Sequence, residues 1–228
     1  MQIYSHNFYL QALSRLTLTI LICSVVYATN MPEVDQNTKF VGQIHLYNNV
    51  VNFPIPIWQQ KAMLANGSRQ SKSSDQPYKT YRKEVPGQII IEMIPKNETF
   101  ENWTHLFAIL AYHAPKTPTV TQMQNISRSI FIKSCKKLSI SDQVFTKITH
   151  KATLETYICS GLDDSQEGEI MVKYIGILPN GLIINIYQEW KSKGLQINDP
   201  TTWPISRETL KTTQKEFADI SIYPIPKL

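Results

Sequence analysis

The stretch GQIIIEMIPKNETFENWTHLFAILAYH, residues Gly87–His113, decides how the fold is predicted from the sequence. Its first part, Gln88–Ile94, alternates along the chain with apolar residues on both faces, a pattern typical of a strand inside a sheet. Pro95 cannot donate a backbone hydrogen bond and should end that strand. The prediction of fold class therefore depends on the residues after Pro95.

The second half of this stretch has helical spacing. Thr99 is a suitable N-cap, and Glu101 in the first turn would interact favourably with the helix dipole. An apolar stripe continues at three- and four-residue spacing: Phe100, Trp103, Phe107 and Leu110. The pattern predicts a helix that runs from Thr99 to about Tyr112.

Two further helices are predicted towards the C-terminus. Thr119 and Gln122 have the spacing of a capping box, and Ser206 is a suitable start for the last helix. Leu210 and Phe217 should lie on the inner side of the last helix. The helix after Thr119 has an expected buried face of four apolar residues: Met123, Ile126, Ile130 and Phe131.

Strands are predicted on either side of these helices. The turn Pro179-Asn180-Gly181 joins 170–178 to 182–190 and predicts a long antiparallel hairpin. Segments 144–150 and 154–159 also have the pattern of paired strands, and 38–47 that of a strand with Phe40, Ile44 and Leu46 on one face.

Two segments of the N-terminal half do not have the pattern of central strands. Pro54 and Pro56 exclude 52–58 from the middle of a sheet and favour an extended edge or cover. Residues from about 64 to 84 are polar and predict a surface insertion. Together with the other elements, these patterns predict an α+β domain, with an antiparallel sheet and helices packed on one face.

The first 28 residues have the pattern of a signal peptide, with Arg15 as their only charged residue. The apolar run 16–28 ends in Val26-Tyr27-Ala28, so cleavage is expected after Ala28. This run is shorter than the ~20 residues that span a bilayer, and an uncleaved anchor is the alternative. Cleavage would leave one domain, 29–228, without an integral membrane segment.

Two cysteines, Cys135 and Cys159, lie beyond the expected leader. In an exported chain such a pair most simply forms a disulfide, worth roughly 3 kcal/mol on the chain-entropy estimate. The bridge would tie the end of the second helix to a strand. A catalytic cysteine is the alternative, but neither residue stands in a motif for nucleophilic catalysis.

No motif in the sequence identifies a catalytic residue, cofactor or metal site. His105 and His113 lack the spacing of metal ligands, and the acidic run 163–169 has Tyr174 where an EF-hand loop requires glutamate. Glu92 would be a candidate acid or base only if it faced inward beside a partner. The formal net charge of +5 is spread thinly and predicts no nucleic-acid partner.

Four Asn-x-Ser/Thr sequons start at Asn66, Asn97, Asn102 and Asn125. Because Asn102 and Asn125 fall within predicted helices, whereas glycan acceptors favour surface loops, we interpret the sequons as chance and the host as bacterial.

The segment 89–106 resembles a signature of uncharacterised exported gammaproteobacterial proteins, E-x-I-P-x-x-E-T-x-x-N-W-T. The matching residues are Glu92, Ile94, Pro95, Glu98, Thr99, Asn102, Trp103 and Thr104. Asn97 replaces the usual glycine, and the two later cysteines and the C-terminal hairpin are similar in layout. The resemblance implies export but no activity. The order of elements is also similar, by analogy, to the Mog1/PsbP-like architecture.

We therefore expect a periplasmic or secreted protein that is not an enzyme and that binds a protein or an envelope component. One alternative is an exported enzyme with a pocket near Glu92, and another is a secreted virulence-associated factor that acts on a host cell.

Overall fold

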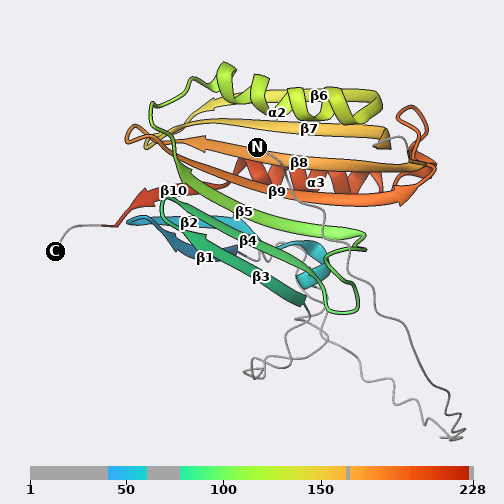
Figure 1. The fold of residues 1–228 in the computed structure, drawn as a ribbon, viewed down its shortest axis with the longest axis horizontal. Helices are drawn as coiled ribbons and strands as arrows, with labels where there is room; N and C mark the ends of the chain where they lie inside the picture. The colour runs from blue at the N-terminus through green and yellow to red at the C-terminus, as the bar shows by residue number, and fades with distance from the viewer. Residues whose placement is uncertain (1–40, 61–77, 163–164, 226–228) are drawn as a thin grey trace, which may run out of the picture. The chain divides into compact units, whose positions relative to one another are not determined.

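The computed structural model describes residues 41–60, 78–162 and 165–225, all within one compact unit, Lys39–Leu228 (Figure 1). The expected leader, Phe40, residues 64–77 and the start of the acidic run lie outside the described residues. The elements are β1 (Val41–Leu46), β2 (Asn49–Pro54), β3 (Tyr78–Val85), β4 (Gln88–Pro95), β5 (His105–His113), α2 (Val120–Ser134), β6 (Cys135–Thr146), β7 (Lys151–Leu162), β8 (Glu167–Ile177), β9 (Leu182–Lys193), η2 (Pro200–Thr202), α3 (Arg207–Ala218) and β10 (Ser221–Pro224).

The described strands form two antiparallel sheets. The larger has seven strands in the order β3-β4-β5-β9-β8-β7-β6, and the smaller has three in the order β1-β2-β10. The hairpin predicted around Pro179-Asn180-Gly181 is confirmed as β8 and β9. Gly181 has φ +82° and supplies the left-handed conformation that this turn requires.

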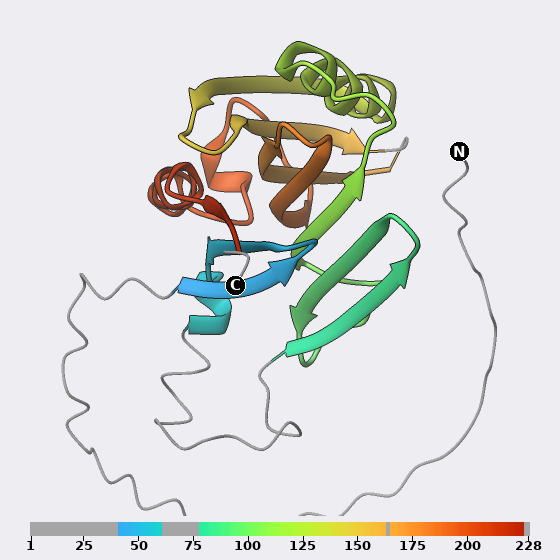
Figure 2. The same ribbon diagram turned by 90° about the vertical axis from the view of Figure 1, so that its left-hand side faces the viewer.

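Helices α2 and α3 pack on opposite faces of the larger sheet (Figures 1 and 2). Glu155 on β7 contacts Arg128 of α2, whereas the next residue, Thr156, accepts a hydrogen bond from Gln214 of α3. Successive strand residues point to opposite faces, so the two helices cannot share one. The α+β prediction agrees with the structure, but the placement of the helices on one face is wrong.

The smaller sheet and α3 share the second face of the larger sheet. Phe107 of β5 stacks on Phe53 of β2 and meets the edge of Phe217 from α3. Val51 and Ile91 lie in the same core and are almost fully buried. We call the opposite side of the larger sheet, on which α2 packs, the α2 face.

The helix predicted from Thr99 to Tyr112 is wrong. The chain turns through 98–104 and then forms β5, which pairs with β4 and β9. A strand buried on both faces is apolar at nearly every position, so any three- or four-residue spacing can be found in it. Five such residues of β5 are buried: Leu106, Phe107, Ala108, Ile109 and Ala111.

The other two predicted helices are confirmed at their starts. Thr119 and Gln122 form a reciprocal capping box at α2, and Ser206 caps α3, whose Leu210 and Phe217 are buried. The predicted buried face of α2 is wrong in part. Ile126 and Ile130 are 57% and 58% exposed, whereas the polar Gln124 and Ser127 are buried.

Three strand predictions need correction. β2 ends at Pro54 and is the central strand of the smaller sheet, because both prolines fall at or beyond its end. Residues 78–84 belong to edge strand β3 and not to a loop insertion. Strand β6 starts at Cys135 and ends at Thr146, so the predicted strand 144–150 covers only its last residues and the turn after it.

Candidate functional site

Most of the signature residues build the connection between β4 and β5. The Glu98 carboxylate accepts hydrogen bonds from the backbone N–H groups of Thr104, at 2.7 Å, and His105, at 3.3 Å, and from the Thr104 hydroxyl. Thr99 Oγ1 accepts a bond from the N–H of Asn102 at 3.2 Å. These contacts give the residues a structural role in the turn.

Two other signature residues lie near the two ends of the turn. Pro95 is the last residue of β4. The ring of Trp103 lies under the Lys191 ammonium, with 4.1 Å between Nζ and the ring centroid. This cation–π contact connects the turn to the end of β9.

Glu92 stands apart from the turn, in a row of residues that crosses the larger sheet. Residues directly opposite one another in antiparallel strands point to the same face. The register places Glu92 opposite Ala108, then Tyr187, Lys173 and Glu155 in order. Because Glu155 contacts α2, the whole row lies on the α2 face.

Under α2, the polar side chains of this face are paired. Arg128 donates from Nε to Glu155 at 3.0 Å and forms an ion pair with Asp142 at 2.9 Å. The Tyr157 hydroxyl donates to the other oxygen of Glu155 at 2.8 Å. Lys173 donates to the Ser127 hydroxyl at 3.0 Å, and burial lowers the pKa of its amine.

Beyond α2, three polar side chains of this face have no hydrogen-bond partner. Within the described part of the chain, Glu92, Tyr187 and Glu189 make no hydrogen bond, and Glu189 is only 8% exposed. Burial raises the pKa of Glu92, and burial together with the neighbouring Glu169 raises the pKa of Glu189 to about 8. Glu189 is the buried member of this trio, whereas Glu92 and Tyr187 are half-buried, and buried carboxyl groups are rarely left without a hydrogen-bond partner.

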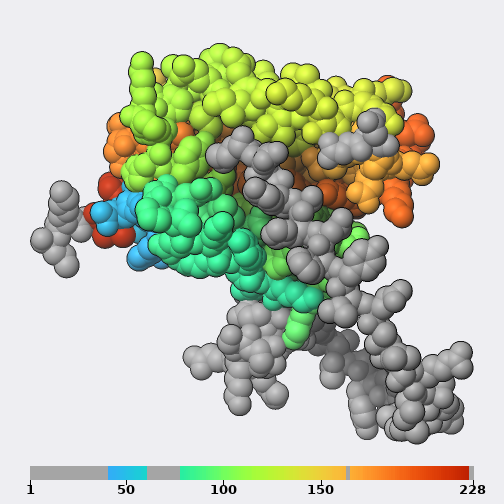
Figure 3. All heavy atoms as spheres, viewed as in Figure 1, coloured from blue at the N-terminus to red at the C-terminus, as the bar shows by residue number. Residues whose placement is uncertain are grey.

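Two exposed apolar residues of α2, Ile126 and Ile130, lie on the side of the helix that faces β9. Met123, Ile126 and Ile130 succeed each other at helical spacing, so they form one stripe along α2. Met123 packs on Ile175 of β8 and Ile183 of β9, which places the stripe on the β9 side of the helix. Figure 3 shows this face, with the atoms of α2 above and those of β3 and β4 below. We name Glu92, Tyr187, Glu189, Ile126 and Ile130 the trio-and-stripe surface.

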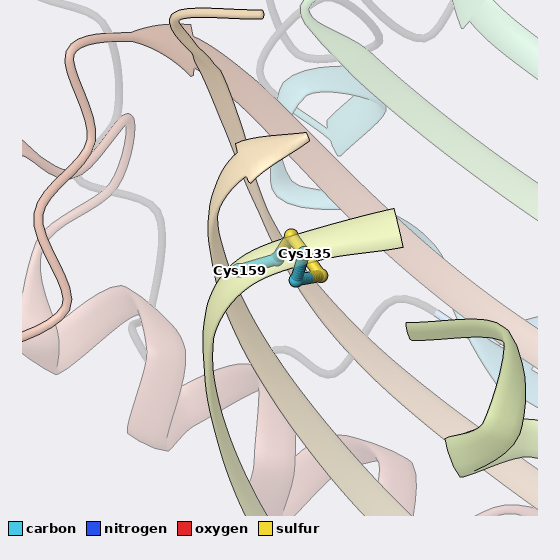
Figure 4. The surroundings of a disulfide bond; sticks show 2 residues. All are labelled: Cys135 and Cys159. Carbon is cyan, nitrogen blue, oxygen red and sulfur yellow. A yellow bond between two sulfur atoms is a disulfide. The ribbon is translucent and has the colours of Figure 1, made fainter. Parts of the chain in front are cut away.

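The predicted cysteine pair forms a disulfide on the same face (Figure 4). Cys135 comes directly after the last turn of α2, and Cys159 is fully buried on β7, with 5.5 Å between the two Cα atoms. Phe131 and Tyr157 stack beside it. The bridge therefore holds the end of α2 against the sheet, as the sequence predicts.

The predicted histidine positions do not form one site. His105 and His113 lie at the two ends of β5, not on a helix. His150 contacts Tyr174 on the opposite face of the sheet from the trio-and-stripe surface. Among the described residues, no group of three His, Cys, Asp or Glu side chains could hold a metal ion. In the same part of the chain, no helix is long and apolar enough to cross a membrane.

Sequence reasoning included Glu92 but missed Tyr187, Glu189, Lys173 and Arg128. A signal was present, because Lys173 and Glu189 are the only charged residues in the largely apolar runs IMVKYIGIL and LIINIYQEW. Charged residues are rarely placed inside buried strands without a role. Their positions relative to Glu92 depend on the strand order, which separates β4 from β9 by β5 alone.

Comparison with known proteins identifies no family. No protein-family model matches the chain. No curated protein matches it either. Among solved structures, the crystal structure of the Saccharomyces cerevisiae Ran-binding protein Mog1p is similar at 9% sequence identity and a TM-score of 0.45. That match covers 82% of this chain and 97% of Mog1p. The α+β assignment rests on the strands and helices of this chain themselves.

Proposed function

We propose that this chain is an exported bacterial protein that binds another protein through the trio-and-stripe surface. The observation that carries the proposal is the trio Glu92, Tyr187 and Glu189, three convergent polar groups without hydrogen-bond partners in the described part of the chain. Exposed Ile126 and Ile130 add apolar area beside them. Protein interfaces combine such apolar area with a few fixed polar groups.

A binding role fits this surface better than catalysis does. An enzyme using Glu189 as an acid would need a second group to take or supply the proton. No described residue is hydrogen-bonded to Glu189, and its basic neighbours, Lys173 and Lys191, are engaged with Ser127 and Trp103.

We also propose membership of the gammaproteobacterial signature family, a Mog1/PsbP-like architecture, and a location in the periplasm or outside the cell. The Cys135–Cys159 disulfide supports the location, because such bonds persist in oxidising compartments. Fractionation of cells that express the tagged full chain tests it. Recovery of shortened, disulfide-bonded protein from the periplasm or medium supports export, and full-length reduced protein in the cytosol contradicts it.

Site-specific photo-crosslinking in cells tests the binding surface. A photoreactive amino acid is placed at Ile126 or at Ile130, and at Lys211 on the exposed side of α3 as the matched control. We expect one partner protein to be crosslinked from α2 and not from Lys211, and the purified pair to bind in vitro. Equal crosslinking from all three positions, or none from α2, would contradict the proposed surface.

A further inference from the structure

Glu189 is a buried carboxyl group to which the described residues supply no counter-ion contact. It makes no hydrogen bond or ion pair, although only 8% of the residue is exposed. The charged groups that face it are Glu169 and Lys173 from β8, Lys191 from its own strand and Glu92 from β4. From β5, the residue opposite Glu189 is the apolar Leu106.

Both nearby lysines are occupied by other contacts. The Lys173 amine donates to Ser127 of α2 at 3.0 Å, and the Lys191 ammonium lies over the Trp103 ring at 4.1 Å. Two carboxyl groups, Glu189 and Glu92, therefore face the same side of the sheet with one strand between them. Glu189 is offset by two residues from Tyr187, which lies in the row of Glu92. With strands about 4.8 Å apart and a rise of about 3.4 Å per residue, the backbones of Glu92 and Glu189 are roughly 12 Å apart, a gap that the two glutamate side chains and one long side chain between them can bridge together.

We infer that this gap binds a lysine or arginine side chain of the partner, with its cationic group between Glu189 and Glu92. The inference rests on the proposed function. A cation supplies the attraction that a buried carboxylate otherwise lacks, and a guanidinium can bond carboxylates in a bidentate manner. Tyr187 lies in the same row as Glu92 and two residues before Glu189 on β9, so its hydroxyl is on the same face and can accept a hydrogen bond from the same group.

The stripe on α2 determines what flanks the cation. Ile126 and Ile130 are exposed on the β9 side of the helix, so they can contact the aliphatic stem and the apolar neighbours of the inserted side chain. Lysine and arginine bury their methylene stems on such surfaces while the charge is bound at the tip. The expected recognition element is thus a basic residue within an apolar segment.

NMR titration of the ¹⁵N-labelled mature chain tests this inference without knowledge of the partner. The probes are N-acetyl-lysine amide, N-acetyl-arginine amide and N-acetyl-norleucine amide, which lacks only the ammonium group of the lysine probe. Above pH 8, where the Glu189 carboxyl group is ionised, we expect saturable shifts of the Tyr187 and Glu189 amides with the two cationic probes alone. Equal shifts with the norleucine probe, or no shifts with any probe, would overturn the inference.

Variants that remove one negative charge identify the residues that bind the cationic probe. Glu189→Gln should weaken binding of the lysine probe by roughly tenfold, the loss of about 1.4 kcal/mol. Glu92→Gln should weaken it less, because Glu92 is more exposed. Glu208→Gln, on exposed α3, is the matched control and should bind as the unaltered chain does. Unchanged affinity of Glu189→Gln for the lysine probe would contradict the inferred cation site.

The two proposals can fail separately. If crosslinking from Ile126 and Ile130 finds a partner while the cationic probes do not bind, the cation site is wrong and the interaction surface stands. If the probes bind and no partner is crosslinked, the surface binds small cations and the protein partner is wrong.

Discussion

Arg128 of α2 donates a hydrogen bond from Nε to Oε1 of Glu155 on β7 over 3.0 Å, and the Glu155 side chain has no exposed area. Arg128→Met would leave that carboxylate buried with the Tyr157 hydroxyl as its remaining hydrogen-bond donor. We expect the free energy of unfolding at pH 7 to fall by about 3 kcal/mol, the usual result of removing one partner from a buried pair. Urea unfolding measures it.

A double variant separates the loss of stability caused by an unpaired buried charge from the loss caused by weaker packing. Arg128→Met with Glu155→Leu removes both charges and should recover most of the lost stability, because the pair itself contributes little net free energy. Lys133→Met, on the exposed side of the same helix, is the matched control and should change stability by at most about 0.5 kcal/mol. A single Arg128→Met variant as stable as the unaltered chain would contradict this account.

The signature turn offers a second test. Glu98→Ala removes the acceptor for the Thr104 and His105 N–H groups, so we expect a loss of about 2 kcal/mol, typical of hydrogen bonds to a charged group. Hydrogen exchange at those two amides should accelerate. Glu101→Ala changes an exposed carboxylate three residues away and should leave both quantities unchanged. Equal effects of the two substitutions would show that the turn does not depend on Glu98.

Local chemistry predicted the parts of this fold that depend on neighbouring residues. The caps at Thr119 and Ser206 and the turn at Gly181 act within a few residues, and all three are confirmed. The helix predicted over β5 failed because burial on both faces makes a strand continuously apolar, which only tertiary packing reveals.

The candidate site could be predicted only in part for a related reason. Ile126 and Ile130 have the spacing of a buried stripe, but the sheet reaches the helix on the side of Gln124, Ser127 and Phe131 instead. Glu92 and Glu189 meet on one face because β9 inserts beside β5, far from it in the chain. No local pattern contains that strand order.

Removal of the disulfide should weaken the attachment of α2. Cys135 and Cys159 are 24 residues apart, and a loop of this length contributes about 3 kcal/mol on the chain-entropy estimate. We expect Cys135→Ala with Cys159→Ala to lose that amount in urea unfolding, and faster hydrogen exchange in the last turn of α2. Reducing agent should destabilise the unaltered chain to a similar extent and the double variant not at all. Equal sensitivity of both proteins would contradict the role of the bridge.

His150 should make stability depend on pH in the acidic range. Thr149 donates its hydroxyl proton to Ile222 O, so it accepts from Nδ1–H of His150, and Nε2 accepts from the Tyr174 hydroxyl. This network needs the neutral imidazole. Burial, with a smaller effect of Lys147, lowers the pKa of His150 from 6.5 to about 4.

The direction of the effect is set by that pKa. Between pH 6.5 and about 4 the unfolded chain binds a proton at this position and the folded chain does not, so stability falls as the pH falls. We expect His150→Gln to be less stable than the unaltered chain at pH 7 and the difference to shrink towards pH 4. Urea unfolding at half-unit pH intervals measures it, and a difference that is constant with pH would contradict the neutral network.

Glu189 should make the free energy of unfolding depend on pH in the neutral range. Its pKa is raised from 4.5 to about 8, chiefly by burial and then by Glu169, so the folded chain retains a proton that the unfolded chain releases. The contribution of this group to stability is therefore complete below pH 4.5 and is lost as the pH rises through 8.

Glutamine resembles the protonated acid and does not titrate. We expect Glu189→Gln to match the unaltered chain near pH 4.5 and to exceed it in unfolding free energy by about 2 kcal/mol or more at pH 8, since one pKa unit corresponds to about 1.4 kcal/mol. Glu208→Gln on exposed α3 should show no such difference. A Glu189→Gln variant whose stability parallels that of the unaltered chain from pH 4.5 to 8 would mean that the carboxyl group ionises freely in the folded protein. A carboxylate that ionises freely would give no support to the inferred cation site.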